Sequence, residues 1–177
     1  VNTALSSAQG NLNNKQFPYF NQHDFASVPF PYSNGNAFYN GKQATIKTSG
    51  CGPTSDAMIA SSLTGQIVSP IDVMKAAIPY HGFEGTAHSF HKDFFEKKLG
   101  MKYTNMNPKD KKSIDKVLDS GLPILMSGKS NPKTPDNPFT TGGHYVVIKG
   151  RDAKGNYLVA DPNKRENTLF NPEAMLS

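Results

Sequence analysis

The single cysteine of this chain lies in the stretch Ser49-Gly50-Cys51-Gly52-Pro53-Thr54-Ser55, directly before a helix-like pattern. Apolar residues recur at helical spacing over 52–64. Pro53 suits the first turn of this helix, and Gly65 suits its C-terminal end. Cysteine attacks as a thiolate, and a helix N-terminus with a neighbouring cation favours that form. A single cysteine is, however, more often a buried apolar residue than a nucleophile. The stretch therefore predicts a helix and leaves the role of Cys51 open.

Three further helices and three strands are predicted along the chain. Ser69 suits the N-cap of the second helix, with Pro70 in its first turn. Helices first and strands last is the order of an α+β fold, here with N-terminal helices packed on a C-terminal antiparallel β-sheet. The other two helices are expected over 88–99 and 113–120, and the strands over 122–126, 143–150 and 156–161.

Composition limits the class of protein. The chain has 177 residues, enough for one domain with its own core. Its formal charge is +5 and its isoelectric point is about 9.2, which favours polyanionic surroundings such as an anionic cell wall. The lysines are scattered and not interleaved with aromatic residues, so nucleic acid is not an expected partner. One cysteine excludes an internal disulfide, and no apolar run reaches the roughly 18 residues of a membrane span.

The two ends of the chain suggest how the domain is bounded. Residues 1–16 are polar and weakly patterned, as expected of a linker or a loosely docked arm. We therefore expect residues 17–177 to form the domain. The chain begins at Val1 without a secretory signal, so we expect it to be part of a larger multidomain protein.

The predicted final hairpin shows whether a base and an acid can meet. If Asp152 and Gly155 face each other, His144 lies opposite Asn163. Asp161 is two residues before Asn163, so it lies on the same face as His144 and within side-chain reach. A loop two residues longer keeps this arrangement, whereas a one-residue bulge breaks it. A carboxylate beside an imidazole fixes its tautomer and stabilises its protonated form, which predicts an oriented catalytic base.

A thiol packed against that face would complete a catalytic set. Cys51 would pass its proton to His144, and the resulting thiolate would attack a carbonyl carbon. The oxyanion formed in this attack needs hydrogen-bond donors. The Cys51 backbone N–H is one, and a side-chain amide from upstream is the usual second.

Separated blocks of the sequence, taken in order, carry a family resemblance: Tyr19-Phe20-Asn21-Gln22, Ser49-Gly50-Cys51-Gly52-Pro53-Thr54, Gly142-Gly143-His144-Tyr145-Val146-Val147-Ile148 and Ala160-Asp161-Pro162. With this order and spacing the chain resembles the C39-like peptidases, which are cysteine hydrolases of papain-like fold, over about residues 17–163. The resemblance implies that Cys51 is the nucleophile and His144 the general base and acid. It also implies that Asp161 is the orienting carboxylate and Gln22 the oxyanion-hole side chain.

Three glycines are candidates for substrate contact. Gly50 precedes the cysteine, and Gly142 and Gly143 precede the histidine. Glycine lets a substrate approach the backbone closely. Gly142 and Gly143 equally suit flexible backbone near the site.

Other histidines are candidate metal ligands. His88 and His91 share one helix face, but the zinc-protease pattern with a glutamate after the first histidine is absent. We expect solvated or capping histidines there, and no metal or cofactor. His23, next to Gln22, either lines the cleft or is a surface residue.

We expect a cysteine hydrolase that cleaves an amide bond in a peptide through a thioester. The resemblance implies two settings, leader-peptide cleavage in bacteriocin exporters and action on peptidoglycan peptides by secreted or phage-tail proteins. The chain shows no ATP-binding cassette, so a peptidoglycan stem or cross-bridge peptide is the preferred substrate, at the bacterial cell surface or as part of a virion. A leader-peptide or protein-processing protease, or a catalytically silent peptide-binding domain, are the alternatives. The polar insert at 130–138 could shape the groove.

Overall fold

The protein is described by a computed structural model. The predicted linker over 1–16 and the candidate Gly142 lie outside the described residues. Those residues are 17–29, 31–32, 35–36, 38–39, 42–43, 45–77, 88–134, 136–140, 143–163 and 165–176.

Short elements and helices make up the first two thirds of the described chain, and the sheet follows. The first group is η1 (Gln22–Phe25), β1 (Pro31–Tyr32), β2 (Gly35–Asn36), β3 (Phe38–Tyr39), β4 (Lys42–Gln43), α2 (Ile46–Ser49), α3 (Cys51–Thr64), α4 (Pro70–Ala76), α5 (His88–Asp93), η3 (Phe94–Lys98) and α6 (Lys111–Asp119). The second group is β5 (Ile124–Gly128), β6 (His144–Arg151), β7 (Tyr157–Asp161), β8 (Arg165–Phe170) and α7 (Pro172–Leu176).

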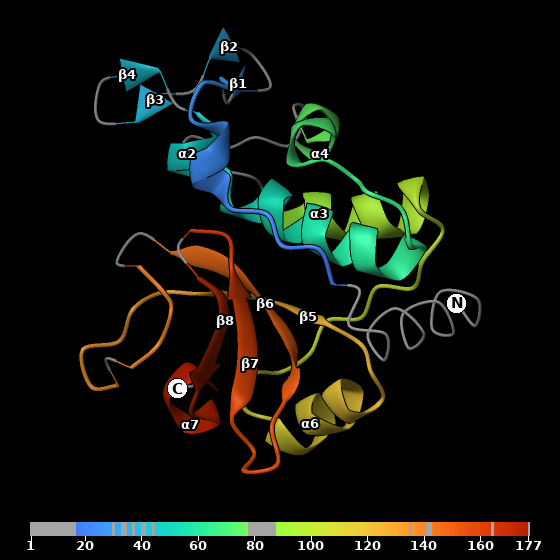
Figure 1. Ribbon diagram of the computed structural model, residues 1–177, viewed down its shortest axis with the longest axis vertical. Helices are drawn as coiled ribbons and strands as arrows, with labels where there is room; N and C mark the ends of the chain where they lie inside the picture. Colours follow the sequence, from blue (N-terminus) through green and yellow to red (C-terminus); the bar gives the residue numbers. More distant parts are fainter. Residues whose placement is uncertain are drawn as a thin grey trace.

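Helix α3 is the central helix, and its first residue is Cys51. It ends at Thr64, where Gly65 takes the left-handed conformation (φ 73°), as predicted. Residues 52–62 are all buried, between α4 on one side and the sheet on the other (Figure 1). A helix that is buried all round is held firmly by its surroundings. The position of Cys51 is therefore set by the core.

The sheet confirms the predicted α+β architecture. Its strand order is β5-β6-β7-β8, with every neighbouring pair antiparallel. Val147 and Ala160 face the core formed with α3, α5 and η3. Val146 and Val159 face the opposite core, formed with α6 and α7, whose helices lie at the lower end of the sheet in Figure 1. Side chains alternate between these cores because the strand period is two.

The β6–β7 hairpin has the predicted register near His144, although its loop length and the pairing next to the loop differ from the prediction. Asp152 N–H donates to the Asn156 carbonyl, so the loop is one residue longer than predicted. The pairing then shifts once within β6, between 148 and 150, which makes Lys149 a bulge residue. The two changes cancel, and Val147 pairs with Ala160 as the prediction required.

Other elements differ from the prediction in extent. The helix expected over 88–99 is α-helical only to Asp93, and its second half is the π-helical η3. Helix α6 begins two residues early because Asp110 caps it, accepting from the Ser113 N–H at 3.2 Å. Strand β5 covers 124–128, not 122–126, and β8 and α7 were not predicted.

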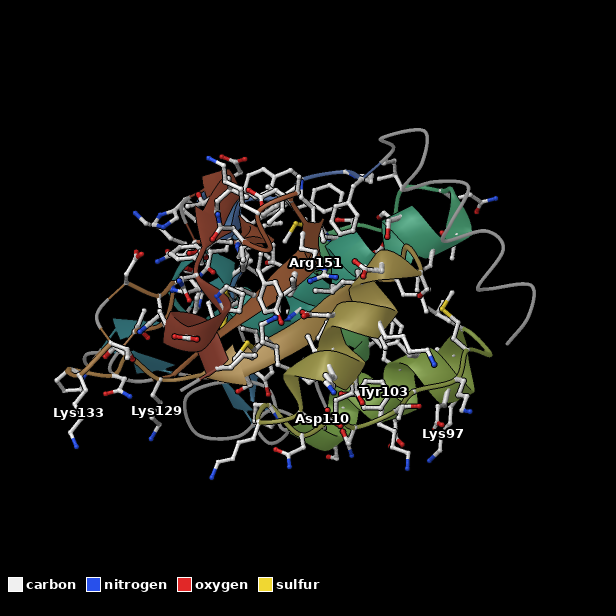
Figure 2. All side chains as sticks on the ribbon, turned by 90° about the horizontal axis from the view of Figure 1, so that it is seen from below. Lys97, Tyr103, Asp110, Lys129, Lys133 and Arg151 are labelled. Atoms are coloured by element: carbon white, nitrogen blue, oxygen red, sulfur yellow. The ribbon has the colours of Figure 1, made fainter. Side chains whose placement is uncertain are left out.

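Arg151 at the end of β6 joins the sheet to α6. Its guanidinium, labelled in Figure 2, donates to the carboxylates of Asp115 and Asp119.

Among the helices of the described residues, none has the length and apolar character that crossing a bilayer requires.

Candidate functional site

Three predicted site residues from three elements meet at one end of the sheet. Cys51 begins α3, His144 begins β6, and Asp161 ends β7. His144 Nε2 lies 2.6 Å from Asp161 Oδ1. His144 also interacts with Cys51, which contributes to the raised pKa of the ring, and because Nε2 faces Asp161, Nδ1 is the nitrogen left to face the sulfur. The histidine therefore bridges the thiol and the carboxylate.

The electrostatics of this site favour the protonated form of His144. His144 is 6% exposed and Asp161 is 2% exposed, whereas Cys51 is half-buried. Burial alone lowers the pKa of His144, but hydrogen bonds to Asp161 and Cys51, with their negative charges, raise that pKa to about 9. The ring is therefore protonated at neutral pH. An imidazolium beside the sulfur stabilises the thiolate, which is the nucleophilic form.

Asp161 is itself held in place by its neighbours. Its Oδ1 accepts a second hydrogen bond from the Asn163 backbone N–H at 2.8 Å. Its carbonyl oxygen accepts from the Tyr19 hydroxyl at 2.6 Å. A carboxylate fixed in this way holds the imidazole of His144 in one orientation.

Gln22 lies beside the chain segment that leads into Cys51. It begins η1 and is buried, with 4% of its surface exposed. Its backbone N–H donates to the Pro162 carbonyl, and its Nε2 donates to the Lys47 carbonyl in α2, each at 2.6 Å. A longer contact of 3.5 Å joins Nε2 to the carbonyl before Lys47. Both contacts are to carbonyl oxygens of α2, so the Gln22 amide nitrogen faces the segment that leads into Cys51.

Glycine is favoured at Gly50 by lack of space and at Gly143 by the backbone conformation. A Cβ at Gly50 would lie 2.6 Å from both Cγ2 and the backbone oxygen of Ile46, so glycine is required there by the packing of α2 on α3. Gly143 has φ +94°, which side chains rarely adopt. Their predicted contact with substrate remains a prediction.

The predicted insert lies next to Gly143. It connects β5 to β6, and its ends are joined by the Ser130 N–H, which donates to the Thr140 carbonyl at 2.9 Å. The Cγ and Cε atoms of Lys129 lie 3.8 and 3.9 Å from the position that a Cβ of Gly143 would take. The insert therefore borders the residue immediately before the histidine of the site.

A second histidine–aspartate pair joins α3 to α5 in the interior and was missed from the sequence. His91 of α5 and Asp56 of α3 are 1% and 0% exposed, with Nδ1 2.5 Å from Oδ2. Burial raises the pKa of Asp56, and the charge and hydrogen bond of His91 partly offset this. The His91 ring also lies against Tyr145, with centroids 4.5 Å apart.

His91 was therefore wrongly expected to be solvated or capping. The sequence signal that could have found the pair is Asp56 itself, a carboxylate in the middle of a helix that is otherwise small or apolar. Such a residue is rarely buried without a partner. Within the described residues, no three or more His, Cys, Asp or Glu side chains are grouped so as to hold a metal ion.

Comparison with known families agrees with the fold. A sequence model of the Peptidase_C39 like family matches residues 14–173. The chain therefore belongs to this family, and it is a cysteine peptidase by membership. Comparisons with curated proteins and with solved structures gave no match.

Proposed function

We propose that the protein hydrolyses an amide bond in a peptide with Cys51 as nucleophile, His144 as proton carrier and Asp161 as its orienting group. The observation that carries this proposal is the position of His144, which is hydrogen-bonded to Asp161 and interacts with Cys51 at the start of the buried helix α3. The raised pKa of the histidine supports it, because a protonated ring can give its proton to the departing amine.

The chemistry follows from these positions. The Cys51 thiolate attacks the scissile carbonyl carbon, and the carbonyl electrons move to its oxygen. Gln22 Nε2–H and backbone N–H groups at the start of α3 stabilise this oxyanion. The His144 imidazolium gives its proton to the departing amine as the C–N bond breaks, leaving a thioester. Neutral His144 then deprotonates a water that attacks the thioester and releases the acid, and the thiolate and imidazolium are restored.

The proposed substrate is a stem or cross-bridge peptide of bacterial peptidoglycan. The formal charge of +5 suits a polyanionic cell wall. Lys129, directly before the insert, and Lys133, within it, extend on one side of the molecule (Figure 2), and the Lys129 stem borders Gly143. The proposed location is accordingly the bacterial cell surface or a phage tail. Cleavage of a leader peptide or another protein uses the same chemistry and is the second candidate.

Digestion of purified cell walls tests the reaction and the substrate together. Mass spectrometry of the released fragments is expected to show a new amino terminus and a new carboxyl terminus inside the stem or the cross-bridge. Release at the bond between lactate and the first alanine would identify an amidase instead. The Cys51→Ser variant is expected to release nothing, whereas the matched surface variant Asn107→Ala retains full activity.

Three other outcomes would contradict parts of the proposal. Full activity of Cys51→Ser would remove Cys51 as the nucleophile. Cleavage of leader peptides with intact walls would favour the processing protease. Wall binding by the wild-type protein without any released fragment would favour the catalytically silent binding domain.

A further inference from the structure

The segment that carries Gln22 is bound to the turn after β7 by three hydrogen bonds. The Tyr19 hydroxyl donates to the Asp161 carbonyl, and the Gln22 N–H donates to the Pro162 carbonyl, each at 2.6 Å. His23 Nε2 lies 2.6 Å from Asn163 Oδ1. Residues 19–23 are thus joined to three consecutive residues, 161–163. We call this joined unit the Gln22 clamp.

The turn in the Gln22 clamp serves both halves of the site. Its Asn163 N–H holds the Asp161 carboxylate that pairs with His144. The same turn carries the backbone and side-chain acceptors that hold Gln22 and His23. The position of the amide donor relative to the base therefore depends on how tightly residues 19–23 stay on the turn.

The outermost bond of the clamp joins two side chains. His23 is exposed and Asn163 is half-buried. Asn163 Oδ1 is an acceptor, so His23 Nε2 donates, which both the neutral Nε2–H tautomer and the imidazolium can do. An exposed hydrogen bond adds little to folding stability, because water replaces a lost partner. Its loss should loosen η1 and leave the fold intact.

We propose that His23 and Asn163 are positioning residues for the oxyanion site. Their hydrogen bond holds η1 against the turn 161–163 and so keeps the Gln22 amide at its donor position. This inference rests on the proposed function, in which Gln22 stabilises the oxyanion. Neither side chain needs to touch the substrate.

Two thiol reagents separate positioning of the amide from activation of the sulfur. Iodoacetamide alkylates the Cys51 thiolate without forming an oxyanion. The aldehyde acetyl-alanyl-glycinal adds reversibly to the thiol, and its oxygen then takes the oxyanion position. Aldehyde affinity is measured by the protection of Cys51 from iodoacetamide. The variants are His23→Ala, His23→Gln, Asn163→Ala, the double alanine variant, Gln22→Ala and the matched control Asn107→Ala. Like Asn163, Asn107 accepts one exposed hydrogen bond at its Oδ1, in this case from the Lys109 backbone N–H.

We expect the His23→Ala and Asn163→Ala variants to bind the aldehyde about three- to tenfold more weakly, as for one lost hydrogen bond. Their alkylation rates without aldehyde and their melting temperatures should match the wild type. The double variant should lose no more than either single variant, because one bond is removed in all three. His23→Gln should recover part of the affinity, since its amide can donate to Asn163. On a cleaved peptide, kcat should fall and KM should stay constant.

The remaining outcomes overturn the inference in distinguishable ways. Wild-type aldehyde affinity in His23→Ala and Asn163→Ala, with a clear loss in Gln22→Ala, removes the clamp and leaves the proposed function standing. Wild-type affinity in Gln22→Ala removes the oxyanion role of Gln22, as does a wild-type protein that binds no aldehyde, and the inference falls with it. An equal loss of alkylation rate and aldehyde affinity shows an effect on the thiol or the fold, and not on the oxyanion donor.

Discussion

His144 is the residue on which the site depends, because one ring connects the nucleophile to the orienting acid. Its pKa of about 9, against an ordinary value of 6.5, shows that the folded protein binds a proton there more tightly than the unfolded chain does. A group with a raised pKa stabilises the fold below its unfolded pKa, and this contribution is lost as the pH rises through the folded value.

Stability should therefore fall as the pH rises from about 6.5 to 9. The full effect of a shift of this size is roughly 3 kcal/mol in the free energy of unfolding. Urea unfolding of wild-type protein and of Asp161→Asn at a series of pH values checks this. The variant loses the charged hydrogen-bond partner, so its decline should be smaller. Equal slopes in the two proteins would show that His144 does not cause the dependence.

Asp161→Asn should also reduce the rate of hydrolysis. A hydrogen bond to a charged group contributes about 1.5–3 kcal/mol, or about 10- to 100-fold in rate if it acts fully in the transition state. The loss should appear in kcat measured near neutral pH. An Asn variant with unchanged kcat would mean that the ring is oriented without the carboxylate.

Gly50→Ala should damage both the fold and the site. The new methyl group would lie 2.6 Å from a backbone oxygen of Ile46, which cannot rotate away. We expect a loss of about 1–3 kcal/mol in unfolding free energy, typical of overpacking, together with slower alkylation of Cys51. Gly150→Ala is the matched control, because no atom lies within 4 Å of its added Cβ. Equal stability of the two variants would refute the packing argument.

At the scale of elements, the buried pair of Asp56 and His91 joins α3 to α5. Removing one partner leaves a buried polar group alone, which costs about 3–5 kcal/mol. Asp56→Leu and His91→Phe should each be destabilising by this order, and the double variant should be more stable than either single one. Urea unfolding of the four proteins forms a double-mutant cycle. Additive losses would show that the two side chains act independently.

The hairpin shows what could be predicted from the sequence at this scale. The facing of His144 and Asp161 was deduced from strand parity, and it is correct although the loop is longer and Lys149 is a bulge. The face on which a side chain lies depends only on whether the total number of extra residues between the paired positions is even or odd. One extra loop residue and one bulge in β6 therefore cancelled. The loop length and the bulge depend on local turn chemistry and packing, which the alternating apolar pattern does not encode.

For the whole molecule, the apolar patterns and cap residues were sufficient for an α+β fold with α3 at its centre. Strand β8 was missed because 165–170 has no alternating apolar pattern. The contacts between distant segments also could not be predicted from the sequence. The bonds from Tyr19 and Gln22 to 161–162 join residues about 140 positions apart, and no local pattern indicates such a pairing. The pairing of His144 with Asp161 could be predicted from the hairpin, whereas the clamp that joins residues 19–23 to the turn 161–163 appears only in the folded chain.

The overall charge leads to a prediction about the substrate. A protein of formal charge +5 is attracted to a polyanionic wall, and salt screens that attraction because the Debye length falls from about 10 Å at 0.1 M to about 3 Å at 1 M. Digestion of whole walls should therefore slow several-fold when sodium chloride is raised from about 0.05 M to about 0.5 M. Hydrolysis of a short neutral peptide with the same scissile bond should change little, since His144 and Asp161 are buried and the peptide carries no charge. The difference isolates attraction to the wall from chemistry at the site. If salt slowed both reactions equally, the charge would be acting on catalysis, and its use as support for a cell-wall substrate would fail.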